Sequence, residues 1–585
     1  MRRIGGIRFL VLCLVGLCLL LGTPACANKQ KRETGRSAPL TEPFLQLPTE
    51  NSVRIVWFTE FEGTEHFVEF GEELGERAYA DTTKLSRTRE DQDSRVDKVP
   101  DGPVFREIWR HEALVAGLEP GTRVSYRVTS VGKKGRIVQS GTYTLAPNPP
   151  PGAPLKILLT SDHQLKPMTP ANLQKVVETV GHVDAVFFAG DLVNIPDRAS
   201  EWFDDSRGNA FFPSMQGLAH RVLNYENVKP LYIGGEIIQY APLFTAIGNH
   251  EVMGRFTKGS LDGEFDDAIP RSVAEVVYET EAQSVNPTND PAVHEQWIRD
   301  HTFNTITYEE IFTLPTSPEG GERYYAVTFG DVRLVVLYAT RMWRTASMSA
   351  SARSKYREPE EQYDDPWQWG HGSHIFEPVS SGSEQYEWLV QELGSPEFLN
   401  AKYRIVMLHH PLHSLGANVI PPFTDPVRVI EWGADGSVES VRYGYPVEND
   451  YLIRYIQPLL EGAGVDLVLF GHSHLWNRFE GPTGVHYLET SNVGNSYGAY
   501  VGLTKREDIP DDYEGEFAAT GDPNGLEPVM PTLISSGIHD AYITSNESTV
   551  FSVLDTAIGT VSSYYFYTRS PDSPVIKFDE FMLED

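Results

Sequence analysis

Five short clusters of aspartate, asparagine and histidine hold the residues of this chain that could carry out chemistry. In chain order these are Asp162 with Gln164, Gly190-Asp191, Gly248-Asn249-His250-Glu251, His409 and Gly471-His472-Ser473-His474. Carboxylate, amide and imidazole groups are ligands that suit hard or borderline divalent cations, and no cysteine lies among them. The clusters therefore predict a site for a pair of divalent cations.

Each cluster directly follows a short apolar run of the kind that forms a buried β-strand. These runs cover residues 157–161, 186–189, 243–247, 405–408 and 465–470. Open α/β sheets bind ligands at the carboxyl ends of their strands. A helix predicted over 169–180 separates the first two strands, and its right-handed crossover places Asp162 and Asp191 at the same sheet edge.

The chain of 585 residues is too long for a single core and indicates more than one domain. Residues 44–147 alternate between apolar and polar with period two, which predicts an all-β sandwich of the immunoglobulin or fibronectin type III kind. Within it, a Pro120-Gly121 turn precedes a strand that carries Tyr126, and we expect the tyrosine-corner hydrogen bond of such sandwiches. A proline-rich linker at 148–154 separates this domain from a second one at 155–585.

The first 27 residues have the pattern of a signal peptide and not of a folded segment. Arg2 and Arg3 precede an apolar run over 9–21 that is too short to be taken as a permanent membrane span. The polar segment 28–43 then predicts a tether. We therefore expect an extracytoplasmic protein.

The end of the signal segment permits two interpretations. Cys26 could be lipidated as the new N-terminus, or Ala25 and Ala27 could mark an ordinary cleavage site. All three cysteines of the chain lie in this segment, at Cys13, Cys18 and Cys26. The mature protein would have no disulfide, and Cys26 could serve as an anchor to the membrane. The prediction is a periplasmic or membrane-anchored lipoprotein, or otherwise a secreted protein.

The formal net charge of −32 disfavours nucleic acid as a partner, because a phosphate backbone requires a basic surface. Three inserts have no assigned role from the sequence, and they lie near 201–232, 258–301 and 347–383. The last insert is polar, carries His371 and His374, and predicts a mobile loop over the site.

The order of the motifs, D-x-(H/Q)…GD…GNH(D/E)…H…GHxH behind a fibronectin-like domain, resembles the calcineurin-like metallophosphoesterases. Within that family it is most similar to the purple acid phosphatase branch. The resemblance implies a four-layer αββα fold for residues 155–585 and two divalent cations, zinc, manganese or iron. A single histidine of this kind is more often an ordinary loop residue, so the inference depends on the complete ordered set.

The same resemblance implies a role for each motif residue. Asp191 would bridge the two cations. One cation would be held by Asp162, His474 and, in the place of the usual histidine, Gln164; the other would be held by Asn249, His409 and His472. His250 would face the substrate as a proton donor or oxyanion stabiliser. His410 and His413 follow the ligand His409, and each could contact the phosphate or lie at the surface.

Two positions depart from the family pattern. Asn194 stands where purple enzymes carry the tyrosine that binds ferric iron, so a stable iron–tyrosinate is not expected. Gln164 replaces a histidine that most relatives outside the purple branch carry, and its amide oxygen is a weaker ligand than imidazole for late transition metals. The first cation position could therefore have lower affinity or be more open to water.

The predicted reaction is hydrolysis of a small phosphate ester by hydroxide that the cations activate. The chain has no G-x-x-x-x-G-K-[ST] loop. The sequence leaves open whether the substrate is a monoester or a diester. The alternative is a non-catalytic cell-surface binding protein on a phosphoesterase scaffold, its activity lost through the change at Gln164.

Overall fold

The computed structural model describes residues 38–583 except for 257–258, 345–352, 420, 507–508, 512, 514–517 and 533–539. The predicted signal segment, Cys26 and most of the tether lie outside the described residues. In the described part of the chain, no helix combines the length and the apolar character that crossing a bilayer would require.

The N-terminal domain is a sandwich of two antiparallel sheets. One sheet has the order β1 (Phe44–Thr49), β2 (Ser52–Thr59), β8 (Trp109–Ala116), β5 (Asp81–Lys84). The other has the order β10 (Ile137–Gln139), β9 (Val124–Val131), β3 (Glu65–Phe70), β4 (Glu76–Tyr79), with β11 (Tyr143–Leu145) also pairing β9. Val53, Ile55 and Trp57 alternate along β2 and are buried against Val68 and Val128 of the facing sheet. The predicted all-β sandwich is confirmed.

The tyrosine-corner prediction for Tyr126 is wrong. Its hydroxyl donates a hydrogen bond to the carbonyl of Gln239 at 2.7 Å, a residue of the second domain, and does not return to its own corner. The ring lies in the sandwich core, so the hydroxyl at its tip meets the neighbouring domain. Tyr126 therefore joins the two domains.

The second domain contains two stacked sheets. A six-stranded sheet has the order β16 (Leu243–Thr245), β13 (Ala185–Phe188), β12 (Lys156–Thr160), β28 (Ser548–Asp555), β29 (Thr560–Tyr567), β30 (Ile576–Met582). A seven-stranded sheet has the order β17 (Tyr325–Phe329), β18 (Val332–Val336), β21 (Tyr403–Met407), β24 (Leu467–Phe470), β26 (His486–Thr490), β25 (Trp476–Glu480), β27 (Tyr542–Ile543). In each sheet the strands that lead to the chemical motifs are parallel.

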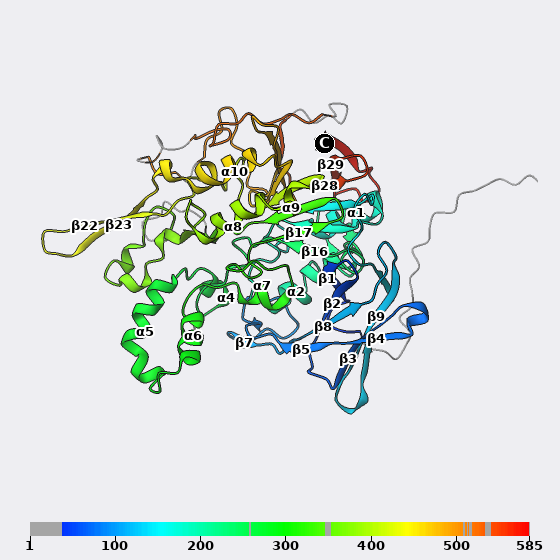
Figure 1. The fold of residues 1–585 in the computed structure, drawn as a ribbon. Coiled ribbons are helices and arrows are strands. Elements are labelled where there is room, and N and C mark those ends of the chain that lie inside the picture. The colour runs from blue at the N-terminus through cyan, green and yellow to red at the C-terminus, as the bar shows by residue number, and fades with distance from the viewer. Residues whose placement is uncertain are drawn as a thin grey trace, which may run out of the picture.

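Helices cover the outer face of each sheet, which gives the expected αββα order (Figure 1). Residues such as Leu334 and Ile405 face the core between the sheets, whereas Val335 and Val406 face the opposite side. On that opposite side lie α8 (Glu384–Leu393), α9 (Pro396–Leu399) and α10 (Gln457–Gly462), the last preceded by the π-helical turn η7 (Leu452–Ile456). The six-stranded sheet is covered by α1 (Thr169–Val180), the helix predicted between the first two strands.

The three inserts fold into elements of their own. The first contains α2 (Ala199–Phe203), α3 (Phe211–Met215), β14 (Arg221–Val222) and β15 (Leu231–Tyr232). The second contains α4 (Leu261–Phe265), α5 (Arg271–Val285) and α6 (Pro291–Asp300), and α7 (Ile306–Ile311) follows it. The third contains η3 (Glu360–Gln362), η4 (Pro366–Gln368), η5 (His371–Ser373) and β20 (His374–Phe376), which pairs β19 (Thr340–Trp343). His374 is buried in the described part of this insert, and the mobility of the loop stays a prediction.

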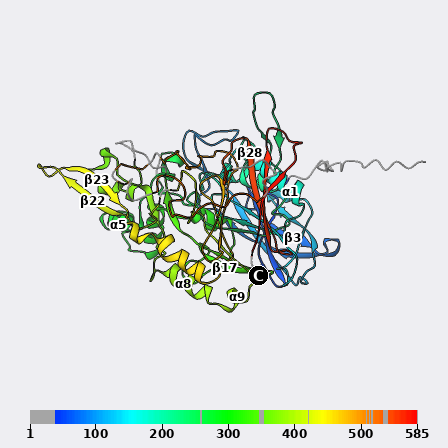
Figure 2. The same ribbon diagram turned by 90° about the horizontal axis from the view of Figure 1, so that it is seen from above.

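The remaining elements lie at the periphery. They are η1 (Glu72–Leu74), η2 (Lys133–Gly135), η6 (Val447–Asn449), the pair β6 (Arg89–Glu90) and β7 (Val104–Phe105), and the hairpin β22 (Val427–Trp432) and β23 (Val438–Gly444). The β22–β23 hairpin projects away from the body of the molecule (Figure 2). The β6 segment is different, because it lies against the second domain beside the site described next.

Candidate metal centre

The loops that follow strands of both sheets bring the predicted ligands together in one buried place. Ligand atoms of Asp162, Asp191 and His409 lie within 4.8 Å of one another. Nε2 of His409 is 3.2 Å from Oδ2 of Asp191, and Nε2 of His474 is 3.3 Å from Oδ1 of Asp162. Nδ1 of His472 is 3.3 Å from Nε2 of His409. The site is therefore shared between the two sheets, β12, β13 and β16 on one side and β21 and β24 on the other.

The glycines of the motifs allow this close approach. A Cβ atom on Gly248 would lie 2.2 Å from Oδ1 of Asp191, and one on Gly471 would lie 2.2 Å from Oδ2 of Asp162. A Cβ on Gly190 would lie 2.7 Å from the backbone nitrogen of Gly248. Any larger residue would push the loops apart, so the glycines are required for the ligands to meet.

Several ligand residues have left-handed backbone conformations that are uncommon outside glycine. The φ angle is 56° at Asp162, 61° at Asp191, 80° at His472 and 56° at His474. Such conformations cost roughly 1–2 kcal/mol per residue and tend to gather at functional sites. Local propensity would not choose them, so tertiary contacts hold these residues in place.

Each of the three predicted histidine ligands is oriented by a backbone carbonyl. Nδ1 of His409 lies 2.8 Å from the carbonyl of Ala189, and Nδ1 of His474 lies 2.9 Å from that of Asn495. Nε2 of His472 lies 3.2 Å from the carbonyl of Asn418. The other nitrogen of His409 and of His474 faces a carboxylate, and that of His472 faces Nε2 of His409. A ring fixed by a carbonyl through one nitrogen is the usual arrangement around metal-ligating histidine.

The oxygen atoms of the site also fit a pair of cations. Among the described residues, Oδ1 of Asp162, Oε1 of Gln164 and Oδ1 of Asn249 are buried and accept no hydrogen bond. Buried oxygens without a hydrogen-bond donor are energetically costly and rare, so these three indicate positions where a cation could bind. Together with the imidazole nitrogens they form a nitrogen and oxygen donor set suited to zinc, manganese or ferrous iron.

The electrostatics of Asp191 and His409 are consistent with that assignment. Burial lowers the pKa of His409, but the nearby carboxylates of Asp191 and Asp162 outweigh burial and raise it to about 10. Burial acts to raise the pKa of Asp191, yet His409 and His250 hold it well below its usual range. Metal ligation requires a neutral imidazole, so His409 would have to lose this proton in order to bind a cation.

The side chain of His250 contacts the Asn194 loop and Phe265, and it is not one of the predicted metal ligands, unlike that of its neighbour Asn249. Nδ1 of His250 donates to the carbonyl of Asn194 at 2.7 Å, which leaves Nε2 as the nitrogen available to a substrate. Its ring stacks on Phe265 with the ring centroids 5.1 Å apart. Burial lowers the pKa of His250 to about 4, despite the opposing field of Asp191.

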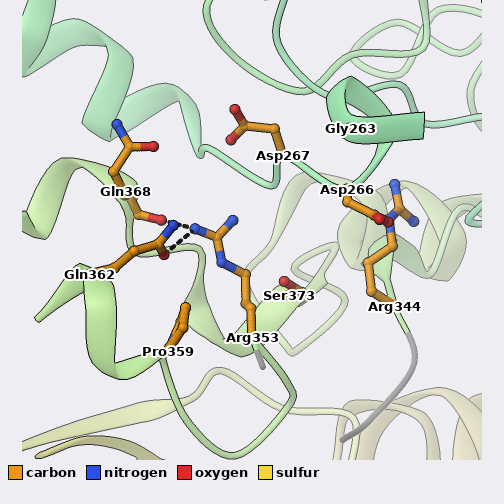
Figure 3. Close-up of a pocket in the computed structure, with 9 residues that line it drawn as sticks. All are labelled: Gly263, Asp266, Asp267, Arg344, Arg353, Pro359, Gln362, Gln368 and Ser373. Atoms are coloured by element: carbon orange, nitrogen blue, oxygen red, sulfur yellow. Dashed lines mark hydrogen bonds and ion pairs between the residues drawn. The ribbon is translucent and has the colours of Figure 1, made fainter. Parts of the chain in front are cut away.

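A cavity of about 610 Å³ opens beside His250. Asn194, Phe265 and Asp266 line it on the side of the second domain, and Asp93 and Arg95 of the N-terminal domain line it on the other. A separate cavity of about 450 Å³ lies between Arg344 and Arg353 (Figure 3). Neither cavity is lined by a predicted metal ligand, but only the first of the two is lined by His250, the residue that follows Asn249.

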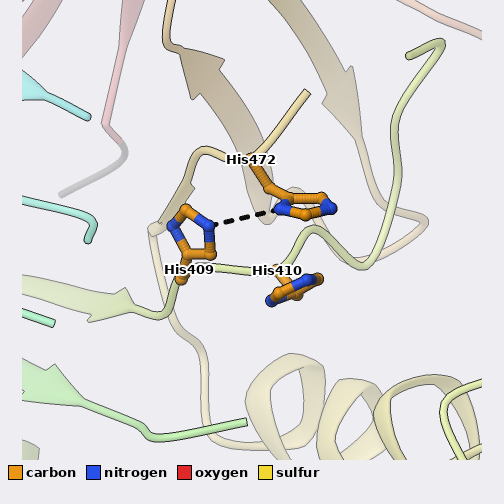
Figure 4. Close-up of side chains that lie close together, drawn as sticks. All are labelled: His409, His410 and His472. Carbon is orange, nitrogen blue, oxygen red and sulfur yellow. Dashed lines mark hydrogen bonds between the residues drawn. The ribbon is translucent and has the colours of Figure 1, made fainter. Parts of the chain in front are cut away.

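His410 and His413 are buried, so the surface role that the sequence left open for them is wrong. The ring of His410 lies 3.8 Å from that of His472, centroid to centroid, beside His409 (Figure 4). Neither ring nitrogen of His410 has a hydrogen-bond partner among the described residues. Nδ1 of His413 lies 2.7 Å from Oδ2 of Asp522, which directs it away from the carboxylates of the site.

Two supporting carboxylates were missed by the sequence reasoning. Glu251 accepts the backbone N–H groups of Gly248, Asp191 and Leu192 at 2.7–2.8 Å and so holds two motif loops together. Glu489 accepts the N–H of Ser473 at 2.8 Å and holds the last motif loop in the same way. Burial raises the pKa of each to about 8. The final position of the Gly-Asn-His-Glu motif could have indicated Glu251, but no local pattern marks Glu489.

Comparison with known proteins decides the family. The calcineurin-like phosphoesterase family model matches residues 155–475, and the model of the purple acid phosphatase N-terminal domain matches residues 41–146. The chain belongs to the calcineurin-like phosphoesterase family. Members of this family use a dinuclear metal centre, and the cluster of Asp162, Asp191 and His409 is a candidate group for metal binding in this chain. The similarity supports a phosphoric ester hydrolase that acts on small phosphate esters.

Two solved structures were compared, and one of them supports the architecture. A purple acid phosphatase, PPD1 from yellow lupin (Lupinus luteus) seeds, is 15% identical with a TM-score of 0.50, covering 92% of this chain and 74% of that one. GAP50, described as the anchor in the inner membrane complex of Plasmodium, is 9% identical with a TM-score of 0.30, covering 73% of this chain and 89% of that one. No curated protein matches the chain. The architecture of this chain, a β-sandwich followed by a phosphoesterase domain, thus matches that of a purple acid phosphatase.

Proposed function

We propose that this phosphoesterase hydrolyses small phosphate monoesters or diesters with two divalent cations, zinc, manganese or iron, held by the predicted ligands. The observation that carries the proposal is the orientation of His409, His472 and His474. Each ring is fixed through one nitrogen by a backbone carbonyl, and its other nitrogen faces the ligand cluster. A site built only for structural stability would not leave three buried oxygens, on Asp162, Gln164 and Asn249, without hydrogen bonds beside three converging imidazoles.

The ligands divide around Asp191. Asp162, His474 and Gln164 would hold one cation, Asn249, His409 and His472 would hold the other, and Asp191 would contribute to both. Two bound cations would supply hydroxide at neutral pH and withdraw charge from the phosphoryl oxygens. The remaining steps depend on the residues of the chain itself.

His250 acts on the substrate side of the site. With Nδ1 donating to the carbonyl of Asn194, Nε2 carries a proton only in the imidazolium form of His250, and in that form it donates to the oxygen of the leaving group. The cavity beside it has the volume of an ordinary small-molecule pocket and can hold that leaving group. Phe265, stacked on the ring, keeps it from rotating away.

A panel of aryl and alkyl monoesters, diesters and nucleotides, assayed together with metal analysis, tests this function. Asp191→Asn should lose both bound metal and turnover, because the shared carboxylate is weakened for both cations. Asp184→Asn is the matched control, since Asp184 precedes the same strand, β13, and accepts the N–H of Lys156 at its opposite end. Two metals per chain and normal rates in Asp191→Asn would overturn the ligand assignment.

The panel also separates the enzyme from a binding protein on the same scaffold. Wild-type protein with both cations bound but no turnover of any ester would favour the binding protein. The complete set of ligands favours the enzyme, because a protein that had lost its activity would have no need to keep seven convergent metal ligands.

We further propose that the protein is extracytoplasmic and anchored through Cys26, with simple secretion as the alternative. The support is the signal-like segment and the confinement of all cysteines to it. Cys26→Ser should release the protein from the membrane fraction or block its processing. A soluble wild-type chain that begins at Asn28 would support secretion instead.

A further inference from the structure

A chain of buried contacts leads from the N-terminal domain to the catalytic histidine. Its first member is Asp91, which follows β6 and is fully buried. Nη2 of Arg198 lies 3.1 Å from Oδ1 and 3.3 Å from Oδ2 of Asp91. Arg198 belongs to the second domain and immediately precedes α2. The contact is therefore an ion pair across the domain boundary.

Arg198 in turn forms an ion pair with Glu201. Nη1 of Arg198 donates to Oε1 of Glu201 at 3.1 Å, and both side chains are buried. The other oxygen of Glu201 accepts the backbone N–H groups of Asn194 and Ile195 at 2.7 and 2.9 Å. Glu201 is thus the group that fixes the backbone of this loop, and Arg198 fixes Glu201.

The last link joins that loop to the active site. The carbonyl of Asn194 accepts the hydrogen bond from Nδ1 of His250 at 2.7 Å. This bond decides which tautomer His250 adopts and where its Nε2 points. A shift of the loop by 1 Å would move the proton donor relative to the leaving group, and displacements of that size can cost about 100-fold in rate.

Beyond the ion pair, the same segment of the N-terminal domain reaches the site directly. The carbonyl of Arg95 accepts the N–H of Ser206 at 2.8 Å, which fixes this turn to the second domain. Asp93 and Arg95 then form one wall of the cavity at His250. The domain boundary is held next to the site by further buried pairs, such as Arg89 with Asp197 at 2.7 Å.

We propose that the N-terminal domain is part of the active site, with Asp91 acting through Arg198 and Glu201 as a positioning residue for His250. The N-terminal domain thus helps to position a catalytic side chain, in addition to packing against the second domain. The inference rests on the proposed role of His250 in ester hydrolysis. It extends that function by assigning the orientation of the proton donor to a different domain.

The test compares Asp91→Ala with Asp204→Ala. Asp204 accepts hydrogen bonds from Arg106 at 2.7 Å across the same domain boundary but has no contact with Glu201 among the described residues. We expect Asp91→Ala to lower kcat for alkyl phosphates roughly 10- to 100-fold with little change in KM, and Asp204→Ala to leave both constants near the wild-type values. Activated aryl phosphates should lose less, because their leaving groups need no proton.

A double variant shows whether Asp91 acts through His250. In a His250→Ala background, Asp91→Ala should cause little further loss, because the group that it positions is gone. A loss of the same size in both backgrounds would overturn the proposal, and so would equal losses in Asp91→Ala and Asp204→Ala. Should Asp91→Ala fail to fold, Asp91→Asn, which keeps the shape and removes the charge, serves for the same comparisons.

Hydrogen–deuterium exchange provides a measure that does not depend on turnover. The peptide that spans residues 192–203 contains the N–H groups of Asn194 and Ile195, and these should exchange faster in Asp91→Ala than in Asp204→Ala. Unchanged exchange in Asp91→Ala would overturn the proposal even in a fully active enzyme. Faster exchange in a protein that hydrolyses no ester would retain the connection and reject the proposed function instead.

Discussion

The side-chain amide of Gln164 donates a hydrogen bond to Oδ2 of Asp191, the carboxylate assigned to both cations. The residue that departs from the usual histidine therefore does not leave the site. Its amide oxygen remains without a hydrogen-bond partner and is able to accept a cation. Gln164 thus has two functions to offer, as a weak ligand and as an orienting donor for the shared carboxylate.

Gln164→His should raise the affinity of the first cation position, because imidazole binds late transition metals more strongly than an amide oxygen does. We expect the variant to retain more metal than the wild type after dialysis against a chelator. Thr179→His, at an exposed position of α1, controls for the effect of an added histidine. A variant that retains less metal would mean that the hydrogen bond to Asp191 is the more important function of Gln164.

His250→Ala should keep both cations and the fold while losing on the order of 10²–10⁴ in turnover, if His250 is the general acid. The loss should be largest for poor alkoxide leaving groups and small for activated aryl esters. Metal analysis and rates across a series of leaving groups measure both effects. An equal loss across the series would indicate oxyanion stabilisation, and loss of metal would show that His250 is itself a ligand.

The iron-loaded protein should lack the strong visible absorption of an iron–tyrosinate, because Asn194 occupies the position of the tyrosine. An absorption spectrum after reconstitution with iron measures this directly. Tyr497 stacks on the ligand His474 with the ring centroids 4.8 Å apart. If a band appears, Tyr497→Phe identifies whether this ring supplies the phenolate, and the assignment of Asn194 would then need revision.

The N-terminal domain should lose stability as the pH falls below about 6.5. His111 is fully buried beside His66, and burial, with the neighbouring charges, lowers its pKa to about 2. Below pH 6.5, His111 therefore binds a proton in the unfolded chain but not in the folded domain. The stability contributed is complete above that pH and falls by up to about 1.4 kcal/mol per pH unit on acidification.

Calorimetry between pH 7.5 and 4.5 tests this dependence. His111→Gln should lower the melting temperature at pH 7.5, because two hydrogen bonds to Thr59 and Thr82 are disturbed, but should flatten its fall with acid. The exposed His220→Gln should leave the pH dependence unchanged. An acid limb that is identical in wild type and His111→Gln would show that other groups control it.

The sequence by itself identified the loops that carry the predicted metal ligands and the strands that precede them. Apolar runs before Asp162, Asp191, Asn249, His409 and His472 predicted strands, because a buried strand imposes a pattern that can be read locally. The period-two pattern of residues 44–147 predicted the N-terminal sandwich, and the order of the motifs predicted the family.

The tertiary structure alone decided which residues support the site. Glu489 and Arg198 carry no local signal, since what makes them important is a contact with a loop distant in sequence. For the same reason Tyr126 turned out to bond Gln239, and His374 and His410 turned out to be buried. Buried polar groups must find partners wherever the fold brings them, so their roles depend on long-range packing that a one-dimensional pattern does not contain.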